Sequence, residues 1–124
     1  TEEIAFFTKG KARNLRPDAK KDKAEPGISH YMSGARGMLP TVFDIEPPGK
    51  NSRIHQAEKP VQLLQQILGF VTEEKEWVLD QFAGSFSLGE AALSSERNAI
   101  CIEINEEYFE KGKERLLSAK SRSR

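Results

Sequence analysis

Two acidic residues and a glycine turn form a pattern that suits a nucleoside ligand. Asp80 ends a short apolar run, and the turn Phe82-Ala83-Gly84-Ser85 follows directly. In an open α/β sheet, ligands bind outside the carboxyl ends of the strands, where glycine lets the backbone approach them. Glu103 lies roughly 20 residues after this turn, where an acidic residue can bind both hydroxyls of a ribose. Many α/β turns contain glycine and many strands end in glutamate, so this pair needs support from further motifs.

The C-terminal half of the chain predicts the elements that would position these residues. Apolar residues recur at helical spacing after Lys59-Pro60, where proline suits the start of a helix. Short β-type runs then alternate with helix-compatible segments. The predicted elements are a helix from Pro60 to about Phe70, a strand at Trp77–Asp80, a helix over Leu88–Leu93, a strand at Ala99–Ile104 that is buried on both faces, and a helix from the N-cap Asn105 to about Leu117. This order predicts an α/β fold with a parallel sheet.

The N-terminal half gives weaker structural signals. Ile4–Phe7 suits a short buried strand. Residues 13–37 are polar, basic and interrupted by proline and glycine, which predicts a long loop. Met38–Ile45 suits an edge strand, and Glu46-Pro47-Pro48-Gly49 predicts a turn after it.

Composition narrows the class of protein. The chain has 124 residues, enough for one domain, and its 37% hydrophobic and 31% charged residues are typical of a folded soluble domain. The single cysteine, Cys101, excludes an intramolecular disulfide, and no apolar run approaches the roughly 20 residues that span a membrane. We therefore expect a protein of the reducing cytoplasm with no membrane partner. The start at Thr1, without a leader, predicts that a segment is missing upstream.

The charges are balanced in number but not in position. Lysine plus arginine equals aspartate plus glutamate at 19 each, whereas residues 9–23 are strongly basic. A segment of this kind can contact DNA phosphates, although a solvated loop has the same composition. The candidate nucleic-acid contacts are Lys9, Lys11, Arg13, Arg16, Lys20, Lys21 and Lys23.

Three motifs resemble the adenine-N6 and cytosine-N4 DNA methyltransferase family. The first is His55-Gln56-Ala57-Glu58-Lys59-Pro60-Val61, where the family typically has H-P-T-Q-K-P. The second is Asp80-Gln81-Phe82-Ala83-Gly84-Ser85, which is similar to D-P-F-A-G-S-G-T. The third is Ile102-Glu103-Ile104-Asn105, which is similar to I-E-I-D, with Tyr108 following. The order and spacing of the motifs match the family over residues 54–117.

The resemblance implies a partial Rossmann-like fold of an S-adenosylmethionine-dependent methyltransferase. Residues 54–117 would form its cofactor-binding α/β portion, and residues 118–124 a frayed basic tail. Residues 1–53 would hold a strand and the basic, loop-rich part of the target-recognition region. When complete, such an enzyme methylates adenine N6 or cytosine N4 of double-stranded DNA at specific sites, as in restriction–modification.

The resemblance also assigns roles around S-adenosylmethionine. Asp80 would hold the methionine ammonium, Phe82 would wall the cofactor, and Glu103 would accept from the ribose hydroxyls. The backbone at Gly84-Ser85 would approach the methionine end, and Lys59 with its neighbours would border the methionine carboxylate. The expected cofactor-binding residues are His55, Lys59, Pro60, Asp80, Phe82, Ala83, Gly84, Ser85, Glu103 and Ile104.

Simpler explanations exist for some of these residues. Phe82 can be a core residue, Lys59-Pro60 a plain helix start, and His55 a surface histidine. A nicotinamide-dependent reductase would need G-x-G-x-x-G, and only Gly84 and Gly89 are present around the turn, so we discount that class.

Several positions depart from the family pattern. Gln81 stands where the family has proline, Ser87 where it has threonine, and Ala57 where it has a threonine whose hydroxyl would reach the carboxylate. Phe86 replaces a glycine, and a bulky residue disfavours the positive φ that glycine adopts freely. We therefore expect Phe86 to crowd the cofactor turn, so that Phe86→Gly improves cofactor binding.

The catalytic motif of the family does not occur in this sequence. The family holds the flipped base with Asp/Asn/Ser-Pro-Pro-Tyr/Phe, whereas Glu46-Pro47-Pro48-Gly49 lacks the aromatic residue. The resemblance places the catalytic segment upstream of Thr1, so we assign no catalytic residue and no metal ligand, and we expect the chain alone to be inactive. The alternative is a non-catalytic DNA-binding or cofactor-binding remnant. Whether the chain forms a homodimer stays open.

Overall fold

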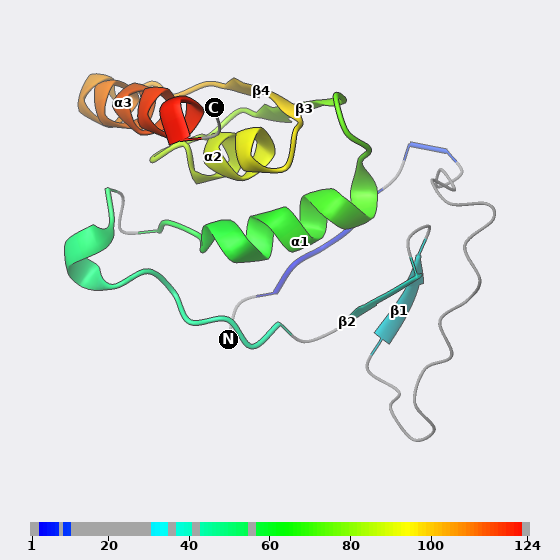
Figure 1. The fold of residues 1–124 in the computed structure, drawn as a ribbon. Helices are drawn as coiled ribbons and strands as arrows, with labels where there is room; N and C mark the ends of the chain where they lie inside the picture. Colours follow the sequence, from blue (N-terminus) through cyan, green and yellow to red (C-terminus); the bar gives the residue numbers. More distant parts are fainter. Residues whose placement is uncertain are drawn as a thin grey trace.

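The structure, a computed structural model, describes residues 3–7, 9–10, 31–34, 37–40, 43–54 and 57–122 (Figure 1). Its elements in chain order are β1 (Tyr31–Gly34), β2 (Gly37–Pro40), the short 3-10 helix η1 (Lys50–Ser52), α1 (Val61–Val71), β3 (Trp77–Asp80), α2 (Ser87–Ser94), β4 (Asn98–Cys101) and α3 (Glu106–Arg122). Within the described part of the chain, no helix is long and apolar enough to cross a membrane.

Parallel pairing of β3 with β4 confirms the predicted strand–helix–strand unit. Trp77 pairs with Asn98 and Asp80 with Cys101, so the carboxyl ends of both strands lie at the same edge. The crossover between them is α2, which packs on both strands. Parallel strands need a crossover of this kind, because a hairpin turn would reverse the chain direction.

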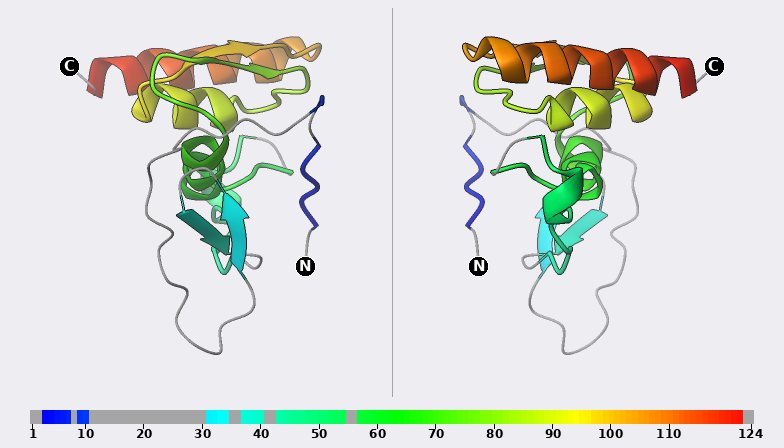
Figure 2. Two further views of the ribbon diagram at one scale, coloured as in Figure 1. Left: turned by 90° about the vertical axis from the view of Figure 1, so that its right-hand side faces the viewer. Right: turned by 90° about the vertical axis from the view of Figure 1, so that its left-hand side faces the viewer.

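The helix α2 lies at the centre of the C-terminal half, between α1 on one side and the sheet with α3 on the other (Figure 2). Ala91-Ala92 is fully buried and packs with Leu68 of α1. Gly89 allows a close approach on the opposite side, where a Cβ would lie 2.9 Å from Cys101 Sγ and 2.9 Å from a methyl carbon of Leu116. Small residues on two faces of α2 therefore let three elements pack around it.

The helix α1 buries the apolar stripe that the sequence predicts. Leu68 is buried, and Val61 and Leu64 pack against the same core. Pro60 immediately precedes the helix with a φ of −59°, close to the value that the proline ring imposes and that a helix requires. The predicted bounds of this helix agree with the structure to within one residue at each end.

The described elements cover the sheet on one face only, so within them the prediction of a strand buried on both faces was wrong. Val78 and Ala99 pack against the α1–α2 core. Successive side chains of a strand point to opposite faces, and the apolar residues of the other face are 50 to 67% exposed: Trp77, Leu79, Ile100 and Ile102. The strand β4 is apolar on both sides, but the described elements supply a layer for only one of them.

A hairpin lies where the sequence predicted a loop followed by an edge strand. β1 and β2 are antiparallel, with Tyr31 opposite Pro40 and Gly34 opposite Gly37. Gly34 and Gly37, two of the glycines that indicated a loop, instead pair with each other at the ends of the two strands. The predicted edge strand over residues 38–45 was wrong at residues 43–45, which form no strand, and residues 41–42 lie outside the described residues.

The prediction of a strand at Ile4–Phe7 was also wrong. A strand needs a hydrogen-bonded neighbour, and the described residues offer none there. Phe6 instead packs edge-on against Phe70 of α1, with the ring centroids 6.4 Å apart. The apolar run thus contributes a side chain to α1 rather than a strand to the sheet.

The helix α3 begins as predicted but ends later. The Tyr108 N–H donates to Asn105 Oδ1 at 3.0 Å, which confirms Asn105 as the N-cap. The helix continues to Arg122, so the predicted end near Leu117 and a frayed tail from 118 were wrong. Lys120 and Arg122 lie in the last turn, where positive charge favours the helix dipole, and Arg122 approaches a Glu90 carboxylate oxygen at 3.6 Å.

A phenylalanine and a glycine form the contact between the start of α2 and α3. Phe86 is buried and adopts a left-handed conformation with φ 62° and ψ 28°. Its ring lies edge-on to Phe109, with the centroids 5.8 Å apart. It also covers Gly112, where a Cβ would lie only 2.6 to 2.9 Å from three ring carbons. Only glycine at position 112 leaves room for this ring.

We predict that Gly112→Ala destabilises the protein although alanine is the better helix former. The new methyl group would overlap the Phe86 ring, and overpacking of this kind costs about 1 to 3 kcal/mol. The matched control is Gly69→Ala in α1, where nothing lies within 4 Å of the added Cβ, so stability should rise by roughly 0.5 to 1 kcal/mol. Urea unfolding of both variants measures the difference, and a Gly112→Ala protein as stable as wild type would contradict the packing described.

Candidate cofactor site

The turn that follows β3 is built by local hydrogen bonds. The Phe82 N–H donates to Asp80 Oδ1 at 3.1 Å, and the Phe86 N–H donates to the Ala83 carbonyl at 2.8 Å. Gly84 has a φ of 52°, a conformation that glycine adopts without steric cost. The backbone of this turn is therefore fixed on both sides of Gly84.

Glu103 joins this turn to the end of β4. Its Oε2 accepts from the Gly84 N–H at 2.6 Å, and its Oε1 accepts from the Asn105 N–H at 2.9 Å. The Ala83 N–H donates to the Ile102 carbonyl at 2.9 Å and extends the strand pairing alongside. A carboxylate has about four acceptor positions, and these two amides use one on each oxygen of Glu103.

Two apolar side chains are exposed at the same strand ends. Phe82 is 90% exposed and Ile104 is 99% exposed. They neighbour Asp80 and Glu103 in the chain, so apolar surface and carboxylates lie together at one edge of the sheet. Small-molecule sites commonly combine apolar walls with a few fixed polar groups. The exposure of Phe82 also shows that it is not a core residue within the described structure.

The other predicted cofactor residues lie in two places. Ala83 and Ser85 are buried in the turn, and the Ser85 hydroxyl lies 3.5 Å from Ser87 Oγ, so Ser85 faces the interior. Lys59 and Pro60 are half-buried and directly precede α1. The remaining predicted residue, His55, lies outside the described residues.

Of the basic segment, only Lys9 is described, and it is exposed. The other predicted nucleic-acid contacts lie outside the described residues: Lys11, Arg13, Arg16, Lys20, Lys21 and Lys23.

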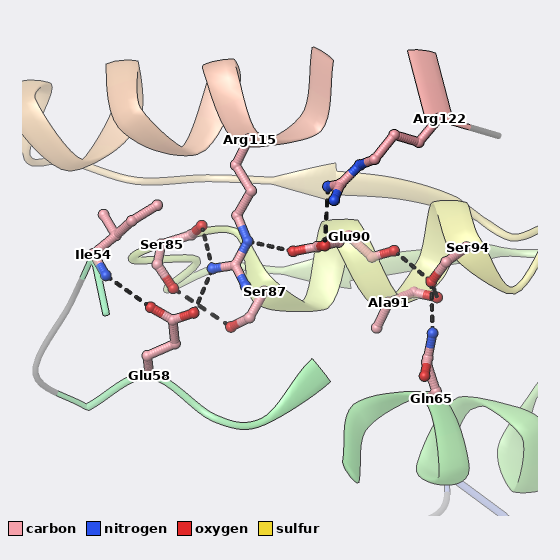
Figure 3. Close-up of polar contacts among 10 residues, drawn as sticks. All are labelled: Ile54, Glu58, Gln65, Ser85, Ser87, Glu90, Ala91, Ser94, Arg115 and Arg122. Atoms are coloured by element: carbon pink, nitrogen blue, oxygen red, sulfur yellow. Dashed lines mark hydrogen bonds and ion pairs between the residues drawn. The ribbon is translucent and has the colours of Figure 1, made fainter. Parts of the chain in front are cut away.

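The structure adds an ion-pair network that the motifs did not indicate (Figure 3). Arg115 of α3 binds Glu58 Oε1 through Nη1 at 2.5 Å and Glu90 Oε2 through Nε. Its Nη1 also approaches the Ser85 carbonyl at 3.3 Å. Glu58 is only 2% exposed, and its second oxygen accepts from the Ile54 N–H at 2.9 Å. One guanidinium thus connects α3, α2, the cofactor turn and the segment before Lys59.

The charge state of Arg115 is fixed by this network. Burial by itself lowers the pKa of the guanidinium, but the hydrogen bonds and charges of Glu90 and Glu58 outweigh that effect and raise it above its ordinary value. Arg115 therefore stays positively charged at any physiological pH.

Helical periodicity places Arg115 on the inward face of its helix, which comparison of motifs does not reveal. Tyr108, Gly112, Arg115 and Ala119 recur at helical spacing, and all four are half-buried or buried. An arginine on the inward stripe of a helix predicts a buried carboxylate partner, since a buried charge is otherwise costly.

The family of this chain follows from its sequence similarity. Residues 1–114 match the family described as DNA methylase, the N6 and N4 methyltransferases. The chain belongs to this DNA methylase family. The match extends beyond the three motifs and includes the N-terminal half.

Curated relatives share both the motifs and the surrounding sequence. The DNA adenine methyltransferase YhdJ of Escherichia coli is 45% identical over 99 residues, which are 80% of this chain and 33% of that protein. The type II methyltransferase M.HpaI of Haemophilus parainfluenzae is 39% identical over 67 residues, which are 54% of this chain and 21% of that protein. The chain thus spans about a third or less of the length of these relatives.

A solved relative supports the fold. The crystal structure of the M1.HpyAVI–SAM complex has a TM-score of 0.54 and 38% sequence identity, and the match covers 57% of this chain and 35% of that one. The observed α/β unit is consistent with the methyltransferase fold of that protein.

Phe86, the main departure of this chain from the family motif, does not crowd the turn, contrary to the prediction. The expected positive φ is present at 62°. The ring, however, packs against Phe109 and Gly112 of α3 and is buried there. Replacing Phe86 by glycine would remove this packing and leave a cavity between α2 and α3, so it would not simply widen the cofactor turn.

The only cysteine of the chain, Cys101, lies beside the site, in β4. Burial and the negative charge of Asp80 raise the pKa of the Cys101 thiol to about 11, against a weak opposing effect from the Gly89 backbone. A thiol needs to be deprotonated to act as a nucleophile. Cys101 is therefore protonated and unreactive at neutral pH, which agrees with its assignment to a structural strand position.

We predict that alkylation of Cys101 by iodoacetamide accelerates about ten-fold per pH unit between pH 7 and 9.5 without levelling off. The raised pKa of about 11 keeps the thiolate a small fraction throughout this range. In denaturant the same thiol should level off above its ordinary pKa of about 8.5. Asp80→Asn should speed the folded-state reaction, because it removes a charge that disfavours the thiolate. A plateau near pH 8.5 in the folded protein would contradict the shift.

Proposed function

We propose that this chain is the cofactor-binding part of a DNA methyltransferase that acts on adenine N6 or cytosine N4. The supporting observation is the junction of Glu103 with Gly84 at the carboxyl ends of β3 and β4. It creates a fixed carboxylate beside a glycine turn, at the edge where α/β folds bind nucleosides. The family membership and the S-adenosylmethionine in the M1.HpyAVI structure favour S-adenosylmethionine as the ligand.

The residues present fit this cofactor. Glu103 would accept from the ribose hydroxyls, and the exposed Phe82 and Ile104 would offer apolar surface to the ring system. Asp80 would pair with the methionine ammonium, and Lys59, with His55, would border the methionine carboxylate. The bound cofactor supplies a methyl group on a positively charged sulfur, and the protein positions it without forming a covalent intermediate.

The open face of the sheet supports a role as one part of a larger enzyme. Trp77, Leu79 and Ile100 form an apolar surface on β3 and β4 that none of the described elements covers. Exposed apolar patches of this kind mark interaction surfaces. The two curated relatives are about three and about five times as long as their matches to this chain. We propose that the rest of the methyltransferase, which carries the base-holding residues, packs on this face.

DNA contact is proposed for the basic segment. Residues 9–23 hold seven of the chain's cations, and cations that meet phosphates release counterions and strengthen binding without sequence preference. In this division, residues 1–53 contribute to target recognition and residues 54–117 bind the cofactor.

We predict that Glu103→Gln weakens binding of S-adenosylmethionine, S-adenosylhomocysteine and adenosine alike, because all three share the ribose. A hydrogen bond to a charged group is worth roughly 1.5 to 3 kcal/mol, or about ten-fold and more in affinity. The control is Glu110→Gln, an exposed glutamate of α3 that pairs only loosely with Lys113 at 3.9 Å. Titration calorimetry gives the affinities, and unchanged binding by Glu103→Gln would refute the ribose assignment.

We predict that the 124-residue chain alone does not transfer methyl groups to DNA. Transfer requires the acceptor nitrogen to be held in line with the methyl group, and such positioning can account for ~7 to 11 kcal/mol of barrier lowering. The sequence holds no Pro-Pro-aromatic motif to do this. The assay is incorporation of radiolabelled methyl groups into unmethylated genomic DNA.

The matching positive experiment fuses this chain to the part of the Escherichia coli relative that lies outside their match. The fusion should regain incorporation, and Glu103→Ala in the fusion should abolish it. If the chain alone incorporated label well above a no-protein control, and Glu103→Ala removed that activity, its own residues would hold the base. If the fusion bound cofactor but stayed inactive, the chain would be better described as a non-catalytic cofactor-binding remnant.

A further inference from the structure

Arg115 lies where three segments of the proposed cofactor site meet. It comes from α3, and its partners are Glu58 before α1, Glu90 in α2 and the Ser85 carbonyl in the turn after β3 (Figure 3). Glu58 and Ser85 belong to different motifs of the family, and neither contacts the other in the hydrogen bonds described. Arg115 is the group that connects them.

The ion-pair network is better suited to fixing the positions of its partners than to stabilising the fold. Side-chain exposure is 17% for Arg115, 2% for Glu58 and 21% for Glu90, so three charges have lost most of their hydration. The attraction within a buried ion pair often only offsets this loss. A guanidinium, however, is planar and donates in fixed directions, so it sets the distance between its partners more strictly than a lysine would.

The turn that Arg115 contacts has an unusual backbone conformation around Ser85. Gly84 and Phe86 both have positive φ values, 52° and 62°, on either side of Ser85. Lys59 directly follows Glu58, and Glu58 also binds the Ile54 N–H. A shift of Arg115 would therefore change the position of the Ser85 carbonyl relative to Lys59.

We propose that Arg115 is a positioning residue for the methionine end of the cofactor. It holds the segment at Glu58-Lys59 and the turn at Gly84-Ser85 at a fixed separation before the ligand binds. This reduces the conformational entropy that is lost on binding. This inference rests on the proposed function, because it assigns the methionine end to these two segments. The ribose end depends instead on Glu103, which Arg115 does not contact in the bonds described.

The test compares two ligands that differ in the methionine portion. Arg115→Met in the full chain should weaken S-adenosylhomocysteine by about ten-fold, while adenosine affinity changes by less than about two-fold. Calorimetry measures the first ligand and NMR titration the second. The matched control is Arg122→Met. Arg122 lies in the same helix and also pairs with Glu90, but its side chain is exposed. This variant should leave both affinities unchanged.

Arg115→Met strands the buried Glu58 charge, so thermal unfolding is recorded for each variant. If Arg115→Met fails to fold, the double variant Glu58→Gln/Arg115→Met removes that charge and is measured in its place. Arg115→Lys keeps the positive charge but not the planar set of guanidinium donors. It should cause an intermediate loss of affinity for S-adenosylhomocysteine only.

The outcomes separate the inference from the function on which it rests. Equal weakening of both ligands by Arg115→Met would show a purely structural role and overturn the inference, as would unchanged binding of both. In either case, wild-type binding that Glu103→Gln weakens would leave the proposed function standing. If the wild-type chain bound neither ligand, the proposed function would fail, and the inference with it.

Discussion

One hydrogen bond organises the site: the Gly84 N–H donates to the Glu103 carboxylate across 19 residues of sequence. Bonds to a charged acceptor are shorter and stronger than neutral ones. Parallel pairing of β3 and β4 brings the two strand ends to one edge, and this bond then fixes the turn after one strand against the end of the other. The same carboxylate accepts from the Asn105 N–H, and Asn105 caps α3 through the Tyr108 N–H. The glycine turn, the acidic residue and the start of α3 are therefore set by a single group.

The unusual Phe86 is explained by a balance between backbone strain and burial. A left-handed conformation costs a non-glycine residue roughly 1 to 2 kcal/mol, whereas burying a phenylalanine side chain contributes about 1.5 to 3 kcal/mol. Packing on Phe109 and Gly112 therefore offsets the strain. This contact packs α3 against the start of α2, and it helps to place Arg115 beside the turn. Phenylalanine at position 86 is less flexible than glycine, but it fixes the position of α3.

Local patterns predicted the C-terminal half well, because each element there carries its own signal. The apolar stripe gave α1, the run Trp77–Asp80 gave β3, and Asn105 gave the start of α3. The misassigned segments are those in which the decisive partner is distant in sequence or absent from the described residues. β4 is apolar on both sides, although one side is exposed. In the segment Ile4–Phe7, Phe6 packs against Phe70 of α1, and the segment pairs with no strand among the described residues. α3 extends past Leu117 to Arg122, which lies 3.6 Å from Glu90, and no local pattern reports that contact.

The site was predictable to a similar extent and for a similar reason. The spacing of the glycine turn and Glu103 indicated their contact, since strand ends in a parallel sheet converge. The motifs did not indicate the partners of Arg115, because the two carboxylates lie 25 and 57 residues away, in α2 and before α1. Phe86 was recognised as strained, but the direction of its ring depends on Gly112, a glycine with no motif of its own.

We propose that the two faces of the sheet have different roles: one supports the cofactor edge, and the other packs against the rest of the enzyme. The helix α2, which carries the Glu90 end of the ion network, lies against the face lined by Val78 and Ala99. The cofactor edge is thus organised by contacts within this chain. The opposite face, with Trp77 and Ile100 exposed, is not covered by any of the elements that the structure describes. A partner segment on that face would meet the strand ends without displacing the helices that hold them. The geometry of the cofactor can therefore be set before the groups that hold the target base are brought to it.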